Sequence, residues 1–295
     1  MNVLFVLNPR SGRRRDFGRL LATIERRCAR SGIVASSIQC DALPHLDGIV
    51  VDAARAGVDA LVAVGGDGTV HELGVRLIGS PLVLGILPVG SGNGLARHLG
   101  IPMDPVAALD GLADAEIATI DTATVDGQRF LGVAGVGFDA EVAHRFGIGG
   151  TRGLASYVRE AALLLRSYRP QRYTITAGEE RRDWNALLVA VANASQYGNE
   201  ARIAPAASLR DGMLDVCILE EPPLLAVPIL LRRLFAGTLR DGAGVSIVRA
   251  TSALVERAEP GRAHLDGEPR VLGASLRFEV VPESLRVLVP RGRRI

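Results

Sequence analysis

Lysine is absent from this sequence of 295 residues, and all 34 of its basic side chains are arginine. A phosphate group bound by this protein therefore cannot be held by a P-loop lysine. The formal net charge is only +2. So small a charge does not indicate a nucleic-acid partner, and we expect none.

Cysteine is also scarce: Cys28, Cys40 and Cys217 are the only three, and they lack the paired spacing of metal ligands. An odd number without such spacing argues against both a disulfide framework and a zinc cluster, and fits a reducing compartment. No apolar run is long enough to span a bilayer, and the apolar start is too short for a signal sequence. We therefore expect a cytoplasmic protein.

The first 115 residues alternate short apolar runs with amphipathic stretches, which is typical of parallel strands joined by helices. Strands are predicted at residues 3–7, 34–38, 60–64 and 82–87, and helices at 17–32 and 49–57. Both helical stretches end at glycine, a common helix terminator. The pattern predicts an N-terminal α/β domain over residues 1–115 with an open, Rossmann-like parallel sheet.

From residue 116 to 295 the pattern changes to strand candidates without regular helices between them. Strands are predicted at residues 118–137, 172–178, 186–194, 213–219, 252–258, 276–281 and 285–289. The dipeptides Asp126-Gly127 and Asp211-Gly212 are turn signals between them. We expect a C-terminal domain of antiparallel β structure, interrupted by helices near 153–168 and 224–236.

Three polar loops with glycine follow the first, third and fourth predicted strands, at residues 8–12, 65–69 and 90–94. Because the carboxyl ends of parallel strands lie along one edge of a sheet, these loops should converge there. Glycine lets backbone N–H groups approach a phosphate, and the helices that should begin after Gly68 and Gly92 would point their positive ends at it. The loops predict a polyphosphate site, although each glycine taken alone could simply turn the chain.

One carboxylate, Asp67, lies among these glycines. A carboxylate beside a triphosphate is repelled unless it binds a divalent cation or accepts a proton from an incoming hydroxyl. Asp67 therefore indicates magnesium, base chemistry or both, and Glu72, one helical turn later, could support it. His71 in the same stretch is expected at the surface.

Six motifs, in this order, span nearly the whole chain: NPRSG, GGDGTVHEL, LPVGSGNGLARHLGIP, GVGFDAEV, LRDGMLDV and LDGEP. Together they resemble the diacylglycerol kinase and sphingosine kinase-like lipid kinases, particularly the bacterial members. The resemblance implies a nucleotide-binding domain, a C-terminal β-sandwich over residues 116–295, and an active site in the cleft between them. It also implies that ATP donates its γ-phosphoryl group to a lipid hydroxyl.

Carried over by position, the resemblance assigns residues to the site. The nucleotide would be bound by Asn8, Pro9, Arg10, Ser11, Gly12, Gly66, Asp67, Gly68, Thr69, Val70, His71, Glu72 and Ser91. Magnesium would be bound by Ser208, Asp211 and Met213, with carbonyls from the first and last, a donor set that suits a hard cation. Glu268 matches the position of the proton acceptor, and the sequence leaves open how Asp67 and Glu268 divide that work. Asp139 and Glu141 match acidic residues that hold the amino headgroup in sphingosine kinases.

The lipid acceptor is left open between diacylglycerol and a sphingoid or ceramide-type lipid. Peripheral membrane contact is expected from apolar surface at residues 154–165 and 224–235 with flanking arginines, although core-facing helices look similar. Two other functions stay open: phosphorylation of a soluble acceptor such as NAD, and nucleotide binding without turnover. The oligomeric state is also open, with a homodimer as one option.

Overall fold

The computed structural model describes residues 1–9, 17–40, 45–148, 159, 161, 163–165, 167–293 and 295. The chain forms two compact units, the first of residues 1–120 and 283–295 and the second of residues 121–282. The division at residue 115 stays a prediction about domains. The compact units differ from it because the last residues, 283–295, return to the first unit.

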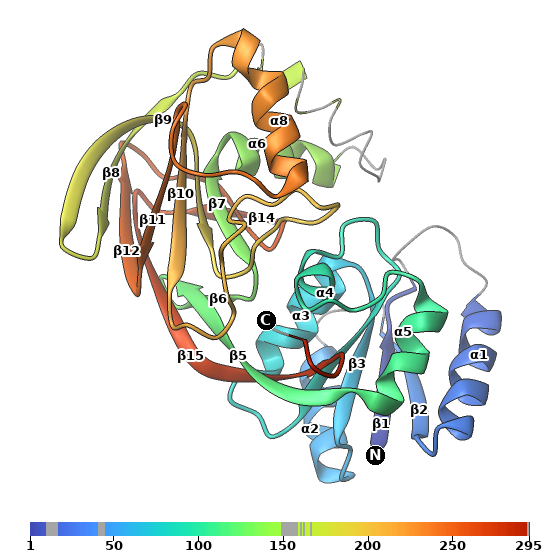
Figure 1. Ribbon diagram of the computed structural model, residues 1–295. Coiled ribbons are helices and arrows are strands. Elements are labelled where there is room, and N and C mark those ends of the chain that lie inside the picture. The colour runs from blue at the N-terminus through green and yellow to red at the C-terminus, as the bar shows by residue number, and fades with distance from the viewer. Residues whose placement is uncertain are drawn as a thin grey trace. The chain divides into compact units, whose positions relative to one another are not determined.

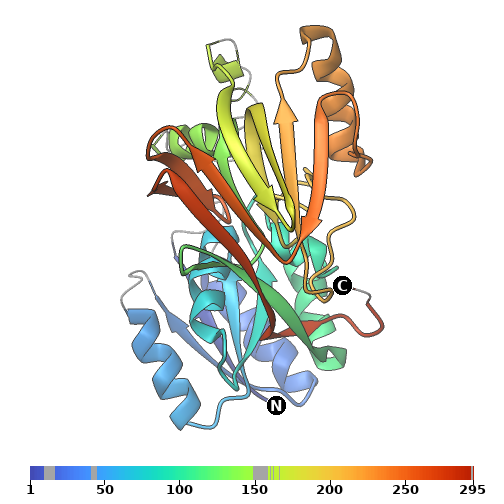
Figure 2. The same ribbon diagram turned by 90° about the vertical axis from the view of Figure 1, so that its left-hand side faces the viewer.

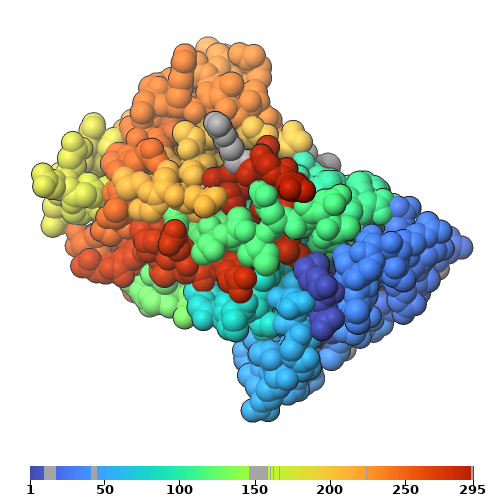
Figure 3. All heavy atoms as spheres, turned by 60° about the horizontal axis from the view of Figure 1, so that its bottom comes forward, coloured from blue at the N-terminus to red at the C-terminus, as the bar shows by residue number. Residues whose placement is uncertain are grey.

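The first unit contains a parallel sheet in the order β4-β3-β1-β2 (Figure 1). Its strands are β1 (Asn2–Leu7), β2 (Val34–Gln39), β3 (Ala60–Gly65) and β4 (Val83–Pro88). Every residue of β3 and β4 is buried, as expected for parallel strands covered on both faces. The four predicted strands are confirmed to within one residue. The amino end of the unit reaches the surface, where the dark blue start of the chain is visible among lighter blue segments (Figure 3).

Helices connect these strands. They are α1 (Phe17–Arg30), α2 (His45–Arg55), α3 (Asp67–Leu77), α4 (Gly94–His98) and α5 (Pro105–Gly111), followed by the short η1 (Leu112–Asp114). The helix α1 contacts α5, and α2 contacts α3. Left-handed Gly32 and Gly57, with φ of 67° and 69°, follow the first two helices and confirm glycine as their terminator. No helix in the described part of the chain is long and apolar enough to cross a membrane.

The second unit is built from antiparallel strands (Figure 2). They are β6 (Gln128–Phe130), β7 (Val133–Gly137), β8 (Gln171–Ala177), β9 (Glu180–Ala192), β10 (Leu214–Glu220), β11 (Val245–Ala250), β12 (Ser252–Arg257), β13 (Gly261–Leu265) and β14 (Glu268–Leu272). Two strands, β5 (Glu116–Val125) and β15 (Ser275–Val289), begin in one unit and end in the other. The predicted antiparallel β structure is confirmed.

The strand β9 is apolar along its second half because both of its faces are buried. Val189 and Val191 point into one cluster with Phe130, while Leu188 and Ala190 point into a second cluster. This alternation follows the period of two of a strand. Leu230 of α8 (Val227–Ala236) also packs in the second cluster. The helix α8 and the short η2 (Leu224–Ala226) before it lie within the helical segment predicted at 224–236.

Several predictions for this half were incomplete. The strands β11, β13 and β14 and the helix α6 (Phe138–Ile148) were missed, and the two strands predicted at 276–281 and 285–289 are the single β15. The missed strands carry charged or polar residues that interrupt the apolar alternation. Most of the helix predicted at 153–168 lies outside the described residues.

The two predicted turns had different outcomes. Asp126 and Gly127 form the two-residue turn between β5 and β6, with φ of 48° and 78°. The prediction that Asp211 and Gly212 join two strands in the same way is wrong. The preceding strand β9 ends at Ala192, and irregular chain lies between it and β10.

Candidate active site

Two of the predicted glycine loops meet in the first unit, at the carboxyl ends of β3 and β4. The backbones are so close that a Cβ atom added to Gly90 would lie 2.4 Å from the Cα of Gly66. A Cβ on Gly65 would lie 2.3 Å from Thr69 Oγ1. Glycine is therefore required at position 90 by the contact between the loops and at position 65 by the Thr69 side chain, in addition to any approach of phosphate.

The carboxylate of Asp67 joins the two loops. Its oxygens accept hydrogen bonds from the backbone N–H groups of Asn93 at 2.8 Å and Gly94 at 2.6 Å. Those groups lie at the start of α4, where N–H donors lack partners within the helix. Asn93 itself has a left-handed φ of 55°, and its amide donates to the carbonyl of Gly90 at 3.0 Å. The carboxylate thus has a structural task, while its base and metal roles stay predictions.

The first loop is described only at its beginning. Asn8 Nδ2 donates to Thr69 Oγ1 at 3.1 Å, which ties the end of β1 to α3. Pro9 is exposed. The predicted nucleotide contacts of Arg10, Ser11 and Gly12 lie outside the described residues. The edge of the sheet therefore brings together Asn8, the loop after β3 and the loop after β4, which confirms the predicted convergence for the described part of the three loops.

The remaining predicted nucleotide residues lie on α3 and in the loop after β4. Gly66 and Gly68 are partly exposed, Thr69 and Val70 are buried, and Ser91 is exposed. The expectation of a surface histidine is wrong, because His71 is only 4% exposed. It lies on the first turns of α3, which pack against β3 and β4.

The expected support of Asp67 by Glu72 stays a prediction. The Glu72 carboxylate pairs with Arg76 at 2.6 Å, one turn along α3, and the same guanidinium donates to Asp47 at 2.8 Å. Burial alone would lower the pKa of Arg76. The hydrogen bonds to Glu72 and Asp47 raise it, and their combined effect exceeds that of burial, so the pKa of Arg76 lies above its usual value.

In the second unit, the LDGE motif forms the turn between β13 and β14. Asp266 and Gly267 have φ of 52° and 85°, as a two-residue hairpin requires. The Asp266 carboxylate accepts three backbone N–H groups at 2.9, 2.7 and 3.1 Å, from Leu131, Gly132 and Val133. Asp266 therefore anchors the turn. The candidate base Glu268 is the first residue of β14 and is half-buried.

Of the predicted magnesium ligands, the Asp211 carboxylate is engaged with other partners. Asp211 forms an ion pair with Arg249 and accepts the N–H of Met213 at 3.1 Å. Ser208 Oγ accepts an N–H of the same loop. Burial raises the pKa of the neighbouring Asp215, an effect that the Arg249 guanidinium partly offsets.

A cation at Asp211 would have to displace the Arg249 guanidinium. Among the described residues no group of three or more His, Cys, Asp or Glu side chains could hold a metal ion. The magnesium role of Asp211 with the carbonyls of Ser208 and Met213 stays a prediction.

The two predicted substrate residues lie on the first turn of α6. Asp139 is 4% exposed and accepts hydrogen bonds from Tyr197 Oη at 2.9 Å and the N–H of Ala140 at 2.8 Å, and it also contacts His264 Nε2 at 3.1 Å. Glu141 forms ion pairs with Arg262 and Arg145. Both carboxylates thus have partners within the protein, and their substrate role stays a prediction.

Sequence reasoning missed Tyr197 and His264, which complete the surroundings of Asp139. The only signal in the sequence is the position of His264, two residues before Asp266 in the LDGE turn. Tyr197 is separated from Asp139 by 58 positions, so no local pattern connects them.

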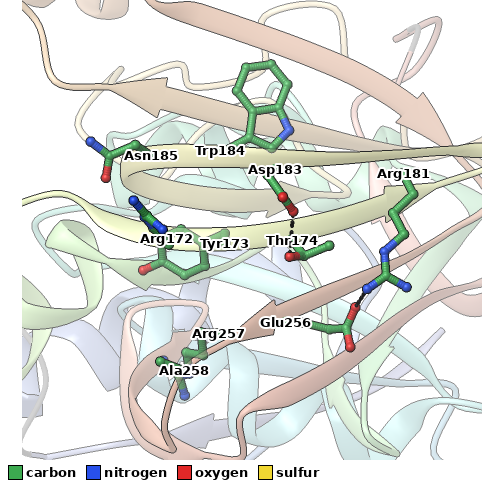
Figure 4. Close-up of a pocket in the computed structure, with 10 residues that line it drawn as sticks. All are labelled: Arg172, Tyr173, Thr174, Arg181, Asp183, Trp184, Asn185, Glu256, Arg257 and Ala258. Carbon is green, nitrogen blue, oxygen red and sulfur yellow. Dashed lines mark hydrogen bonds and ion pairs between the residues drawn. The ribbon is translucent and has the colours of Figure 1, made fainter.

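A hollow of about 510 Å³ lies elsewhere in the second unit, between β8, β9 and β12 (Figure 4). None of the predicted site residues lines it. Among its lining groups, Arg181 pairs with Glu256 at 3.1 Å and Thr174 donates to Asp183 at 2.7 Å.

Both units match known families. Residues 2–125 match the diacylglycerol kinase catalytic domain, and residues 132–289 match the YegS C-terminal NAD kinase beta sandwich-like domain. The chain is 35% identical over 253 residues to a "Probable lipid kinase YegS-like" of Pseudomonas aeruginosa strain UCBPP-PA14, covering 83% of this chain and 81% of that protein. It is 28% identical over 268 residues to "Diacylglycerol kinase" of Bacillus subtilis strain 168, covering 89% and 88%.

Solved structures agree with this fold. A diacylglycerol kinase from Bacillus anthracis strain Sterne has a TM-score of 0.78 at 20% identity, with 98% of this chain and 97% of that chain covered. At so low an identity the likeness supports the fold alone. The expected arrangement of an α/β domain followed by a β-sandwich-like domain is confirmed. The chain belongs to the bacterial lipid kinase family that joins a diacylglycerol kinase catalytic domain to a YegS C-terminal domain.

Proposed function

We propose that this protein is an ATP-dependent lipid kinase that transfers the γ-phosphoryl group of ATP to a hydroxyl group of a lipid. The observation that carries the proposal is the contact between the loops after β3 and β4, held by Asp67 at the edge of a parallel sheet. That edge is where ligands bind in open α/β sheets. Membership of the lipid kinase family supplies the acceptor class.

In this proposal, the phosphates of ATP are bound by backbone N–H groups of the glycine loops and by the positive end of α3. Such a site suits a chain without lysine, because the amides supply donors that need no side chain. Asp67 keeps the two loops in contact through Asn93 and Gly94. Preorganised donors of this kind stabilise the charge on the transferred group without reorganisation.

Glu268 is assigned as the base that accepts the proton of the acceptor hydroxyl. As the hydroxyl oxygen bonds to the γ-phosphorus and the bond to the ADP oxygen breaks, the proton passes to the Glu268 carboxylate. A positioned base of this kind contributes roughly 10²- to 10⁴-fold to the rate. The Asp266 carboxylate is a poorer candidate, because three backbone N–H groups already bind it.

The partners of Asp139 and Glu141 bear on the choice of lipid. An amino headgroup could reach these carboxylates only by displacing Tyr197 and His264 from the first or the arginines from the second. Burying a cation beside an engaged carboxylate is unfavourable. We therefore favour an uncharged acceptor of the diacylglycerol type over a sphingoid base.

The proposal is tested by incubating the full chain with γ-labelled ATP and mixed vesicles that contain diacylglycerol, ceramide or sphingosine, with NAD in a parallel reaction. We expect label in diacylglycerol, and a loss of about 10²-fold or more in the Glu268→Gln variant with unchanged ATP binding. Glu283→Gln, in the first unit, is the matched control. Labelled NAD without labelled lipid would overturn the proposal, and bound ATP without any turnover would favour a nucleotide-binding regulator.

Magnesium dependence is tested in the same reaction. The Asp211 carboxylate is paired with Arg249, and no step of the proposed mechanism is assigned to the ion. We keep the prediction from the sequence that a chelator stops the reaction and that added magnesium restores it. Unchanged labelling in the chelator would remove magnesium from the reaction.

A membrane-facing surface is part of the proposal. Leu225 is 91% exposed, and Ile229 and Leu231 are 51% and 45% exposed on α8, beside the exposed Arg232. Exposed apolar side chains with a flanking cation suit the interface of an anionic bilayer. We name Leu225, Ile229, Leu231 and Arg232 the α8 patch. Of the other predicted membrane segment, 154–165, most residues lie outside the described chain.

A further inference from the structure

A buried chain of hydrogen bonds ends at the turn that carries Glu268. Tyr197 Oη donates to Asp139 Oδ2, which also contacts His264 Nε2 at 3.1 Å. On the other side of the ring, the N–H of Gly267 donates to His264 Nδ1 at 3.3 Å. Asp139 and His264 are 4% and 2% exposed, so water competes little with these bonds.

The direction of the bonds fixes the state of the imidazole. Because the Gly267 N–H can only donate, Nδ1 must accept, and the ring proton therefore lies on Nε2 and is donated to Asp139. The ring is thus neutral, in a single tautomer that the carboxylate selects. The same relation between a carboxylate and a histidine orients the imidazole in metal sites and catalytic triads.

The backbone of β7 makes room for this pair. A Cβ atom on Gly135 would lie 2.1 Å from Asp139 Oδ2 and 2.6 Å from His264 Nε2. The strand β7 pairs with β13 at this point, with Gly135 opposite His264. The pair is therefore enclosed by the sheet on the side of β7.

The turn between β13 and β14 needs this support. Asp266 is a non-glycine residue in the left-handed region, which costs free energy unless its surroundings hold it there. Its carboxylate is anchored by three N–H groups, and the N–H of Gly267, the second turn residue, is bound by His264. The two contacts fix the two turn residues immediately before Glu268.

We propose that His264 is a positioning residue that holds the Asp266-Gly267 turn, and with it the Glu268 carboxylate, while Asp139 and Tyr197 keep its imidazole in the accepting tautomer. This inference rests on the proposed role of Glu268. It gives Asp139 a task different from binding a substrate headgroup. A base must lie within about 3 Å of the hydroxyl proton that it accepts, so a loose turn lowers the rate of transfer without necessarily weakening nucleotide binding.

Two substitutions separate the two sides of the ring. In His264→Asn the amide oxygen can take the place of Nδ1 and accept the Gly267 N–H, whereas the contact with Asp139 is lost. In His264→Gln the longer amide reaches toward the position of Nε2 and Asp139, whereas the acceptor for Gly267 is lost. We expect kcat of the Gln variant to fall about tenfold with the KM for ATP unchanged, and the Asn variant to retain most of kcat.

The stability of each variant is the control for a merely structural effect. Val255→Ala, at a fully buried position of β12, lowers the melting temperature without touching the turn and should leave kcat unchanged. Assays are run well below the melting temperature of every variant. The proposal is overturned if the Gln variant keeps the parent kcat, or if both His264 variants lose kcat equally.

A second readout does not depend on kinase activity. In the ¹⁵N-labelled full chain, the imidazole shifts of His264 should report the neutral tautomer protonated at Nε2. The Gly267 amide should exchange about tenfold faster in His264→Gln than in the parent, and at the parental rate in His264→Asn. An Nδ1-protonated ring, or equal exchange in all three proteins, would overturn the inference. If the parent lacks kinase activity, the proposed function fails, and this exchange comparison alone decides whether His264 holds the turn.

Discussion

Asp67 lies where a catalytic carboxylate would be expected, yet both of its oxygens accept backbone N–H groups of the neighbouring loop. Such charge-assisted bonds are roughly twice as strong as neutral ones. Gly92 passes so close that a Cβ atom on it would lie 2.4 Å from the carboxylate. Substituting a residue that joins two loops should lower stability, whereas substituting a residue that accepts a proton should lower kcat.

Asp67→Asn is the substitution that separates these roles. Its NH₂ group would face a backbone N–H, so one donor loses its acceptor at a cost of about 1–3 kcal/mol of unfolding free energy. We expect a lower melting temperature and weaker ATP binding, measured by thermal unfolding and calorimetric titration. Asp52→Asn, at an exposed position of α2, is the control. If the melting temperature and ATP affinity stay at the parental values while kcat is lost, Asp67 acts as the base and its contact with the neighbouring loop is not needed for stability.

The part of the site that the sequence predicted is the part that depends on local pattern. The glycine loops could be found because each follows an apolar strand directly. The partners of Asp67 could not be found, because a separate loop supplies them more than 25 positions away. The burial of His71 depends in the same way on how α3 packs, which its neighbours in sequence do not specify.

Among the elements, α8 presents apolar side chains in two directions. Leu230 packs into the core of the second unit, whereas the α8 patch is exposed. A helix in a protein that needs no partner usually exposes polar residues on its outer face. The patch therefore favours contact with a surface that is itself apolar and anionic.

Replacing Leu225 and Ile229 together by aspartate should abolish most binding to vesicles that contain anionic lipid, measured by co-sedimentation. The two changes remove apolar area and add charges that the bilayer repels. Activity on a short-chain, water-soluble diacylglycerol should stay near the parental value. Val34→Asp, at a site of β2 that is 66% exposed, is the matched control and should bind vesicles normally. Vesicle binding that survives the double substitution would exclude the patch as the membrane contact.

The success of the strand predictions depended on whether the strand is an unbroken run of buried apolar residues. In the first unit, β3 and β4 are buried on both faces and appear as continuous apolar runs, which the sequence reveals. The strand β13 has the sequence GRAHL, in which His264 is buried. The strand β14 has the sequence EPRVL, in which Arg270 is half-buried. These two residues break the apolar alternation. His264 is a core residue only because Asp139 and Gly267 supply its hydrogen bonds.

At the scale of the whole molecule, β15 is one of the two strands that belong to both units. The start of β15 pairs with β12 in the second unit, and near its end Val287 pairs with Leu84 of β4 in the first. Gly79 donates its N–H to the carbonyl of Ser284 at 2.9 Å. The sequence suggested two strands in one domain, because Pro282 and Glu283 interrupt the apolar pattern. The pairing partner of each half of β15 depends on residues far away in the sequence, which the local apolar pattern does not specify.

Two leucines of β15 test whether the units unfold separately. Leu285 and Leu276 are both fully buried, the first in unit one and the second in unit two. Replacing either by alanine should cost about 2–5 kcal/mol. By hydrogen exchange with mass spectrometry, we expect Leu285→Ala to increase exchange in β1, β3 and β4, and Leu276→Ala to increase it in β8 and β12. If either substitution accelerates exchange in both units equally, the molecule unfolds as one cooperative body.

The return of β15 to the first sheet also sets an order of events during synthesis. Strands β1 to β4 emerge from the ribosome early, but the segment that lies beside β4 is translated last. The edge of the first sheet beside β4 therefore stays uncovered while the whole second unit is being made. Under the proposed function, we expect ATP binding to begin only when residues 283–289 have left the exit tunnel.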